Sequence, residues 1–74
     1  MVFGLIRGDK MKLNDREIVI IDKIAKGYTT KNIAENMNLS ENTVDTYIKI
    51  IILKLGAINR PNMVYLAQQR GLIL

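Results

Sequence analysis

The sequence predicts an all-α fold, a compact four-helix domain with a central helix-turn-helix. Three observations lead to this prediction. Apolar residues recur three or four positions apart, as on one face of a helix, and do not alternate as in a half-buried strand. Residue types that cap helices precede each periodic segment, and glycine or asparagine follows it. A length of 74 residues leaves room for one small core.

The first helix is expected from Asn14 to Lys26. The Asn14 side chain can accept from the backbone N–H three residues on, and Glu17 can reach back, which makes a capping box. Gly27 follows as a helix stop. The expected inward face consists of Ile20, Ile21, Ile24 and Ala25.

A short second helix is expected from Thr30 to Met37, with Thr29 as its N-cap. It ends at Asn38, because asparagine tolerates the left-handed conformation that a tight turn requires. Leu39 is expected to point into the core. The inward face consists of Ile33, Ala34 and Met37.

The third helix is expected from Glu41 to Leu55, between the N-cap Ser40 and the stop Gly56. Its β-branched run also suits a strand, but the cap, the length and the continued helical period favour a helix. Its inward stripe consists of Val44, Ile48, Ile51 and Leu55.

The last helix begins after the cap Asn59, tolerates Pro61 in its first turn and stops at Gly71. Val64 and Ala67 are expected to face inward. Residues 1–12 are expected to be an N-terminal extension, and residues 13–74 the domain itself. The extension's apolar residues are expected to pack on the domain or on a second subunit; they are Val2, Phe3, Leu5 and Ile6.

Composition narrows the class of function. Eleven basic and seven acidic residues give a net charge of +4, which favours an anionic partner such as nucleic acid. The chain has no Cys and no His, so we expect no disulfide, metal, cofactor or enzyme activity. Its apolar runs fall far short of the ~20 residues that span a bilayer, and no signal peptide is evident, which predicts a cytoplasmic protein.

The second helix, the turn 38–40 and the third helix form a helix-turn-helix pattern. Two helices joined by so short a turn must cross steeply, and small Ala34 lets them approach. The second helix of such a pair protrudes and has about the width of the DNA major groove. A plain helical corner would give the same pattern.

The pattern extends into a family resemblance that covers residues 13–73. The runs that carry it are residues 13–17, 24–34, 39–44, 54–57 and 59–60, with the ending Arg70–Ile73. Together they closely resemble the DNA-binding domain of LuxR/GerE type, and region 4 of sigma factors is a lesser alternative. The resemblance implies a sequence-specific regulator of transcription that binds double-stranded DNA.

The third helix carries the expected base contacts. A helical wheel with the inward stripe buried leaves Asn42, Asp45, Thr46 and Lys49 outward. The resemblance implies that the last three approach base edges. Lys49 could bond guanine O6 or N7, Thr46 could meet a thymine methyl, and Asp45 could accept from cytosine N4.

The expected phosphate contacts match family positions that approach the DNA backbone. Helix N-termini, hydroxyls and cations suit phosphate oxygens. The six residues are Thr30, Lys31, Thr43, Tyr47, Lys54 and Arg60. In the family the last helix forms a two-fold dimer contact, which implies a homodimer reading a roughly palindromic site. Here that contact would involve Asn62, Tyr65, Leu66 and Gln69.

Several residues depart from the family pattern. The family usually has a basic residue in place of Asp45, His in place of Tyr47, Glu in place of Val19, and polar residues in place of Ile50 and Leu53. Two lysines and two acids leave residues 41–55 neutral. An alternative is therefore a protein-interaction module of the same fold, a regulator-binding adaptor or antagonist that uses the outward apolar residues.

Overall fold

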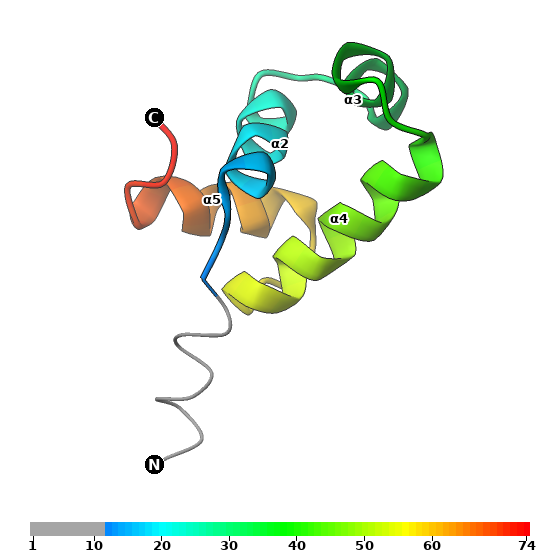
Figure 1. The fold of residues 1–74 in the computed structure, drawn as a ribbon. Coiled ribbons are helices and arrows are strands. Elements are labelled where there is room, and N and C mark those ends of the chain that lie inside the picture. The colour runs from blue at the N-terminus through cyan, green and yellow to red at the C-terminus, as the bar shows by residue number, and fades with distance from the viewer. Residues whose placement is uncertain (1–11) are drawn as a thin grey trace.

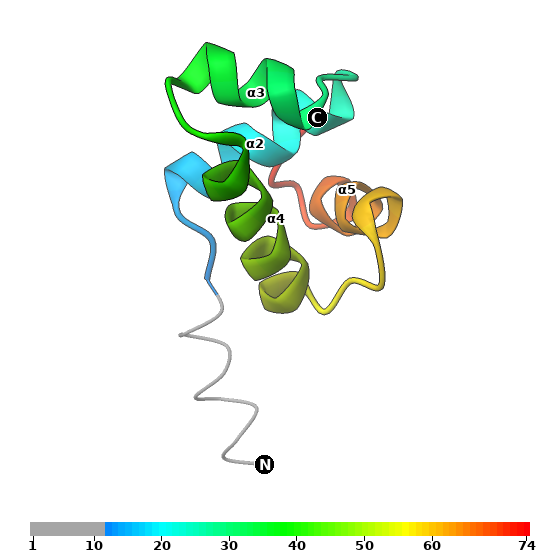
Figure 2. The ribbon, with the colours of Figure 1, turned by 90° about the vertical axis from the view of Figure 1, so that its right-hand side faces the viewer.

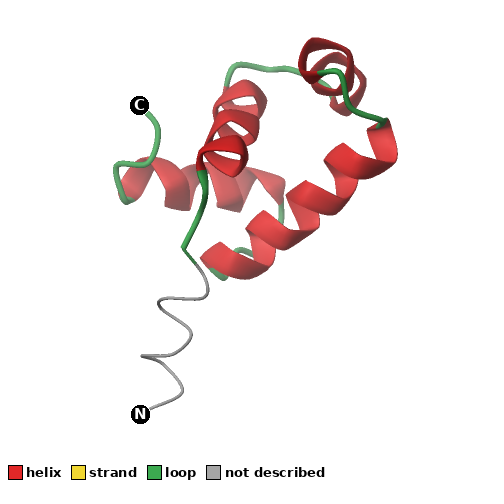
Figure 3. Cartoon of the chain, viewed as in Figure 1, coloured by secondary structure: helices red, strands yellow, loops and turns green. Residues whose placement is uncertain are grey.

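The computed structural model describes residues 12–74, which form four helices. These are α2 (Asp15–Ala25), α3 (Thr30–Met37), α4 (Glu41–Leu55) and α5 (Arg60–Gln69), shown in Figure 1. No strand occurs within this part of the chain (Figure 3). The prediction of an all-α four-helix domain is confirmed. The packing expected of residues 2–6 falls outside the described residues.

Side-chain caps define where the helices begin, as predicted. Asn14 Oδ1 accepts from the Glu17 N–H at 2.9 Å, and the Asn14 N–H donates to Glu17 Oε1 at 2.9 Å. Thr29 and Asn32 form the same reciprocal pair at the start of α3. Each such pair satisfies two N–H groups that a helix or its first turn would leave without partners.

Helices α3 and α4 each end at a residue whose backbone adopts the left-handed conformation. Asn38 has φ 61° and Gly56 has φ 72°, the region that asparagine and glycine tolerate best. The Leu39 N–H then donates to the Ala34 carbonyl at 2.8 Å, which closes the turn between α3 and α4. Leu39 itself is half-buried against the core, as expected.

The core lies where α2, α4 and α5 meet, with α3 crossing the N-terminal end of α4 (Figures 1 and 2). The sequence pattern predicted all but one of the buried apolar residues. The buried apolar residues are Ile20, Ile21, Ile33, Ala34, Val44, Ile48, Ile51, Leu55, Met63 and Ala67. Met63 is the exception and is fully buried, whereas Val64 is only half-buried.

One expectation for an inward residue is wrong: Ala25 is exposed. Val64 packs against the core as expected, although it is less buried than its neighbour Met63. Both residues line an open hollow between the end of α2 and the start of α5, together with Ile24, Arg60 and Pro61. Ala25 is the last residue of α2, and its side chain lies at this hollow and outside the core. No helix within residues 12–74 is long and apolar enough to cross a membrane.

Candidate nucleic-acid interface

Helices α3 and α4 form the expected helix-turn-helix. In Figure 1, α3 is seen almost end-on while α4 runs across the view, so the two axes cross steeply. Ala34 and Val44 are buried where the helices approach each other. The turn of 38–40 fixes this angle through the Asn38 conformation and the Ser40 cap, whose Oγ accepts from the Thr43 N–H at 3.0 Å.

One face of α4 is turned to solvent along its whole length. We call it the outward face; its residues are Asn42, Thr46, Lys49, Ile50 and Leu53, all exposed. Leu53 is 71% exposed. The Thr46 hydroxyl donates to the Asn42 carbonyl at 3.0 Å, and Lys49 has no ion-pair partner among residues 12–74. Three of the four predicted base-contacting residues therefore lie together and accessible.

The fourth predicted base-contacting residue, Asp45, lies on the flank of α4, and its side chain is about half exposed. Arg60, the first residue of α5, forms an ion pair with it: Nη2 lies 3.3 Å from Asp45 Oδ1. The same nitrogen donates to Thr30 Oγ1 at 3.2 Å. One guanidinium group thus joins α3, α4 and α5, and two of the predicted phosphate-contacting residues meet there.

The opposite flank of α4 carries Thr43 and Tyr47, both half-buried. Thr43 Oγ1 accepts from the Ser40 hydroxyl at 2.8 Å. Tyr47 packs against the core, and its hydroxyl accepts from Arg16 Nη1 at 3.3 Å. Arg16 also places its guanidinium 6.0 Å from the Tyr47 ring centroid. An open hollow lies beside these residues, lined by Asn42, Thr43, Thr46, Tyr47 and Ile50.

Arg16 is a cation at this surface that the sequence analysis did not single out. It is exposed, and it lies 31 positions before Tyr47 in the chain. Local patterns gave no signal for it, because the contact depends on how α2 packs against α4.

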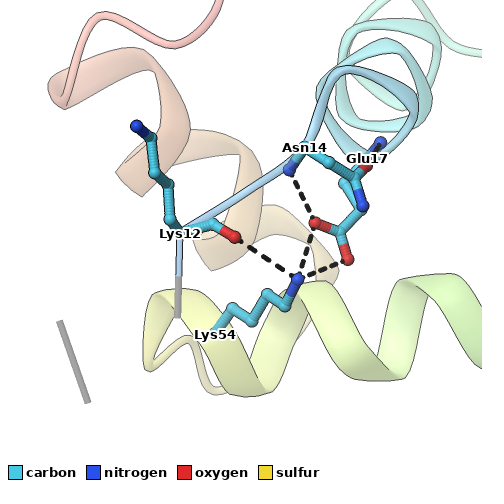
Figure 4. A network of polar contacts seen from close by, with 4 residues as sticks. All are labelled: Lys12, Asn14, Glu17 and Lys54. Atoms are coloured by element: carbon cyan, nitrogen blue, oxygen red, sulfur yellow. Dashed lines mark hydrogen bonds and ion pairs between the residues drawn. The ribbon is translucent and has the colours of Figure 1, made fainter. Parts of the chain in front are cut away.

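Lys54 has a different environment from the other predicted phosphate contacts. Its ammonium lies 2.9 Å from both Glu17 carboxylate oxygens and 3.4 Å from the Lys12 carbonyl (Figure 4). The Glu17 side chain is 3% exposed and that of Lys54 is 19% exposed. Glu17 also completes the α2 capping box, so this one carboxylate joins the start of α2 to the last turn of α4.

The remaining predicted residues lie on α3 and α5. Lys31 is exposed in the first turn of α3 and has no ion-pair partner in the described part of the chain. On α5, Tyr65 is 56% exposed and accepts from Gln69 Nε2 at 3.3 Å. Asn62 is engaged locally, because its Oδ1 accepts from the Ile58 N–H at 3.0 Å. Leu66 packs partly against the core.

Comparison with known proteins agrees with this geometry. The family model described as "Bacterial regulatory proteins, luxR family" matches residues 11–67. The transcriptional regulatory protein YdfI of Bacillus subtilis is 35% identical over 65 residues, which is 88% of this chain and 30% of that protein. A putative transcriptional regulator of Pseudomonas aeruginosa is 41% identical over 82% of this chain and 30% of its own length.

A third relative, the oxygen regulatory protein NreC of Staphylococcus aureus, is 39% identical over 82% of this chain and 28% of that protein. The chain thus spans roughly a third of the length of these curated relatives. The family match covers all of α2, α3 and α4 and most of α5. This chain belongs to the luxR family of bacterial regulatory proteins.

Proposed function

We propose that this chain is a sequence-specific regulator of transcription that binds double-stranded DNA and places α4 in the major groove. One observation carries the proposal: α4 follows α3 at a steep angle and exposes Asn42, Thr46 and Lys49 along one face. Polar side chains in that arrangement suit the donor and acceptor pattern of base edges. Membership in the luxR family and the names of its relatives support the same function.

In this proposal the outward face reads bases and the rim holds the backbone. Lys49 donates to guanine, Thr46 offers its methyl group to thymine, and Asn42 and Asp45 contact adjacent edges. Thr30, Lys31 and Arg60 contact phosphates on one flank, and Thr43 and Tyr47 do so on the other. Lys54 belongs to the same predicted set, and any phosphate contact it makes has to be shared with Glu17.

The chain acts as a homodimer through α5 and reads a roughly palindromic site in the bacterial cytoplasm. Asn62, Tyr65, Leu66 and Gln69 are spaced so that they share one stripe of α5. Exposed Tyr65 supplies the aromatic anchor that favours such a contact. Two subunits present two α4 helices about one DNA turn apart and double the number of phosphate contacts.

Selection from random duplex DNA followed by a salt titration tests the DNA-binding proposal. We expect enrichment of a palindromic site whose half-sites are separated by about one helical turn. The logarithm of the affinity should fall linearly with the logarithm of salt, by about 0.9 for each phosphate neutralised. Absence of any enriched duplex at low salt would reject the proposal.

Sedimentation of Tyr65→Glu tests the dimer. A buried glutamate pair facing itself across a two-fold axis is unfavourable, so this variant should sediment as a monomer. Val19→Glu is the matched control, because Val19 is an exposed apolar residue on α2, and it should leave the dimer intact. A monomeric wild type, or equal effects of both variants, would contradict dimerisation through α5.

The apolar end of the outward face favours a second candidate, a module that binds a regulatory protein. Leu53 is 71% exposed and Ile50 39%, and exposed apolar patches on a protein surface mark sites of interaction with other proteins. If no duplex is enriched, this candidate predicts that Leu53→Asn abolishes binding to a partner regulator, while Ile58→Asn, at an exposed apolar residue outside the outward face, does not. Retention of partner binding by Leu53→Asn would exclude the outward face as its surface.

A further inference from the structure

The ion pair between Asp45 and Arg60 places opposite charges within the candidate DNA-binding surface. The two side chains come from different helices, and their charged atoms are 3.3 Å apart. Arg60 uses the same nitrogen to hold Thr30 at the start of α3. Asp45 thus contacts one residue that the proposal assigns to phosphates, Arg60, and is linked through it to a second, Thr30.

The candidate DNA-binding surface carries few basic side chains that can contact phosphates. Near α3 and the exposed side of α4, the described basic residues outside the Lys54–Glu17 pair are Arg16, Lys31, Lys49 and Arg60. Neither lysine has an ion-pair partner within residues 12–74, whereas Arg60 has one. Whenever Asp45 holds Arg60, one of these four cations is less available to phosphates.

The pair is also easily broken. Arg60 and Asp45 are 45% and 47% exposed, and ion pairs with such exposure contribute little because water screens them. A DNA phosphate can therefore compete with Asp45 for the guanidinium. A base edge that donates a hydrogen bond to Asp45, such as the cytosine amine, gives the carboxylate another partner and favours release of Arg60.

We propose that Asp45 is a discriminating residue, which holds Arg60 away from the backbone of arbitrary DNA and releases it on a sequence that satisfies the Asp45 carboxylate. This inference rests on the proposed DNA-binding function. It makes the phosphate contact of Arg60 depend on a base contact, so that affinity for random sequence is lowered more than affinity for the chosen site.

A double-mutant cycle on a random-sequence duplex tests this coupling. Asp45→Asn should free Arg60, steepen the salt slope by about 0.9 per subunit and make the loss of affinity between 50 and 200 mM salt roughly 3.5-fold larger for each subunit bound. In the Arg60→Gln background the same change should leave the slope unaltered. In the Lys31→Gln background, which keeps Arg60, the full effect should remain.

Glu41→Gln is the matched control for charge alone. Glu41 lies in the first turn of the same helix, is exposed, and forms no ion pair among the described residues. Its substitution removes the same charge, and its effect should be equal in the wild-type and Arg60→Gln backgrounds. If Asp45→Asn behaves in this way too, Asp45 acts by simple repulsion and the inference is overturned.

Heparin separates this inference from the proposed function. This polyanion offers sulfates without base edges, so the release of Arg60 can be measured even if no duplex binds. Asp45→Asn should elute from heparin at higher salt than the wild type, and Asp45→Asn with Arg60→Gln should elute with Arg60→Gln alone. Failure of the wild type to bind any duplex rejects the proposed function; independence of the Asp45 effect from Arg60 on heparin rejects the coupling.

Discussion

The two ends of α4 each carry an ion pair to another helix, and the two pairs differ in burial. Near the C-terminal end, Lys54 binds both oxygens of Glu17, whose side chain is 3% exposed. Near the N-terminal end, Asp45 meets Arg60 through one oxygen, with both side chains about half exposed. The first pair is enclosed by the fold, and the second lies on the surface that we assign to DNA.

This difference indicates what each end of α4 contributes. An enclosed pair stabilises only while both partners are present, because the Glu17 carboxylate alone would be buried without compensation. An exposed pair costs little to break, so its groups remain available to a ligand. We therefore expect substitutions at the Lys54 end to change stability, and substitutions at the Asp45 end to change DNA binding.

Removing Lys54, the partly buried cation of the enclosed pair, should have the largest effect on stability. Lys54→Met leaves the Glu17 carboxylate enclosed with one remaining donor, the Asn14 N–H, and should lower the free energy of unfolding by about 3 kcal/mol. For a domain of this size that loss corresponds to a fall in Tm of roughly 12 to 24 °C. Thermal unfolding followed by circular dichroism measures it.

The conservative change at the other partner is the control. Glu17→Gln keeps a side chain that can cap the Asn14 N–H and leaves Lys54 able to reach water, so it should cost less than Lys54→Met. Combining Glu17→Gln with Lys54→Met should recover part of the loss. Equal and additive losses would show that the two groups do not compensate each other's charge.

Substitution of Lys49 should do the opposite of substitution of Lys54: it should weaken DNA binding and leave the stability of the fold unchanged. Lys49→Ala removes a proposed base contact and should weaken the selected duplex by about 1 to 3 kcal/mol. Its free energy of unfolding should stay within about 0.5 kcal/mol of the wild type, because the side chain is exposed and forms no ion pair among residues 12–74. Fluorescence anisotropy with selected and scrambled duplexes separates a specific loss from a general one.

Substitution of Lys31 is expected to have a smaller effect on DNA affinity, and the same effect on every DNA sequence. Lys31→Gln should reduce the salt slope by about 0.9 per subunit and weaken all duplexes alike. A change in the preferred bases would instead place Lys31 in the groove. The measurement is the same anisotropy titration, repeated across a range of salt concentrations.

Breaking the exposed ion pair between Asp22 and Lys26 within α2 is expected to have the smallest effect on stability. The Lys26 ammonium donates to Asp22 Oδ2 at 2.9 Å, and this hydrogen bond raises the pKa of Lys26 above its ordinary 10.5. From neutral pH up to about 10.5 the pair contributes fully to the stability of the fold, and this contribution is lost as the pH rises through the raised pKa of Lys26. Lys26→Gln should lower Tm slightly at neutral pH and should match the wild type at higher pH. A difference that grows with pH would contradict this linkage.

The sequence was sufficient for the helix boundaries because caps act over three or four residues. Asn14, Thr29 and Ser40 accept from the predicted backbone groups, and Asn38 adopts the left-handed conformation expected of it. The outward position of Lys49 followed in the same way from the helical period. Local chemistry determines these features, so a single sequence contains them.

Tertiary contacts determine the features that the sequence analysis did not anticipate. The partners Glu17 and Lys54 are 37 positions apart, and Asp45 and Arg60 lie on different helices. Met63 is buried in preference to Val64 because of how α5 packs against α2 and α4. No local pattern reports such packing, so the environments of Lys54 and Asp45 could not be derived before the fold was known.

A nuclear magnetic resonance titration of the ¹⁵N-labelled chain with its selected duplex tests most directly that the outward face of α4 binds DNA. The largest amide shift changes should fall on Asn42, Thr46 and Lys49, with smaller ones at Lys31, while the exposed Val19 of α2 remains unchanged. Changes centred on Val19, or no changes at low salt, would contradict the assignment of α4 as the DNA-reading helix.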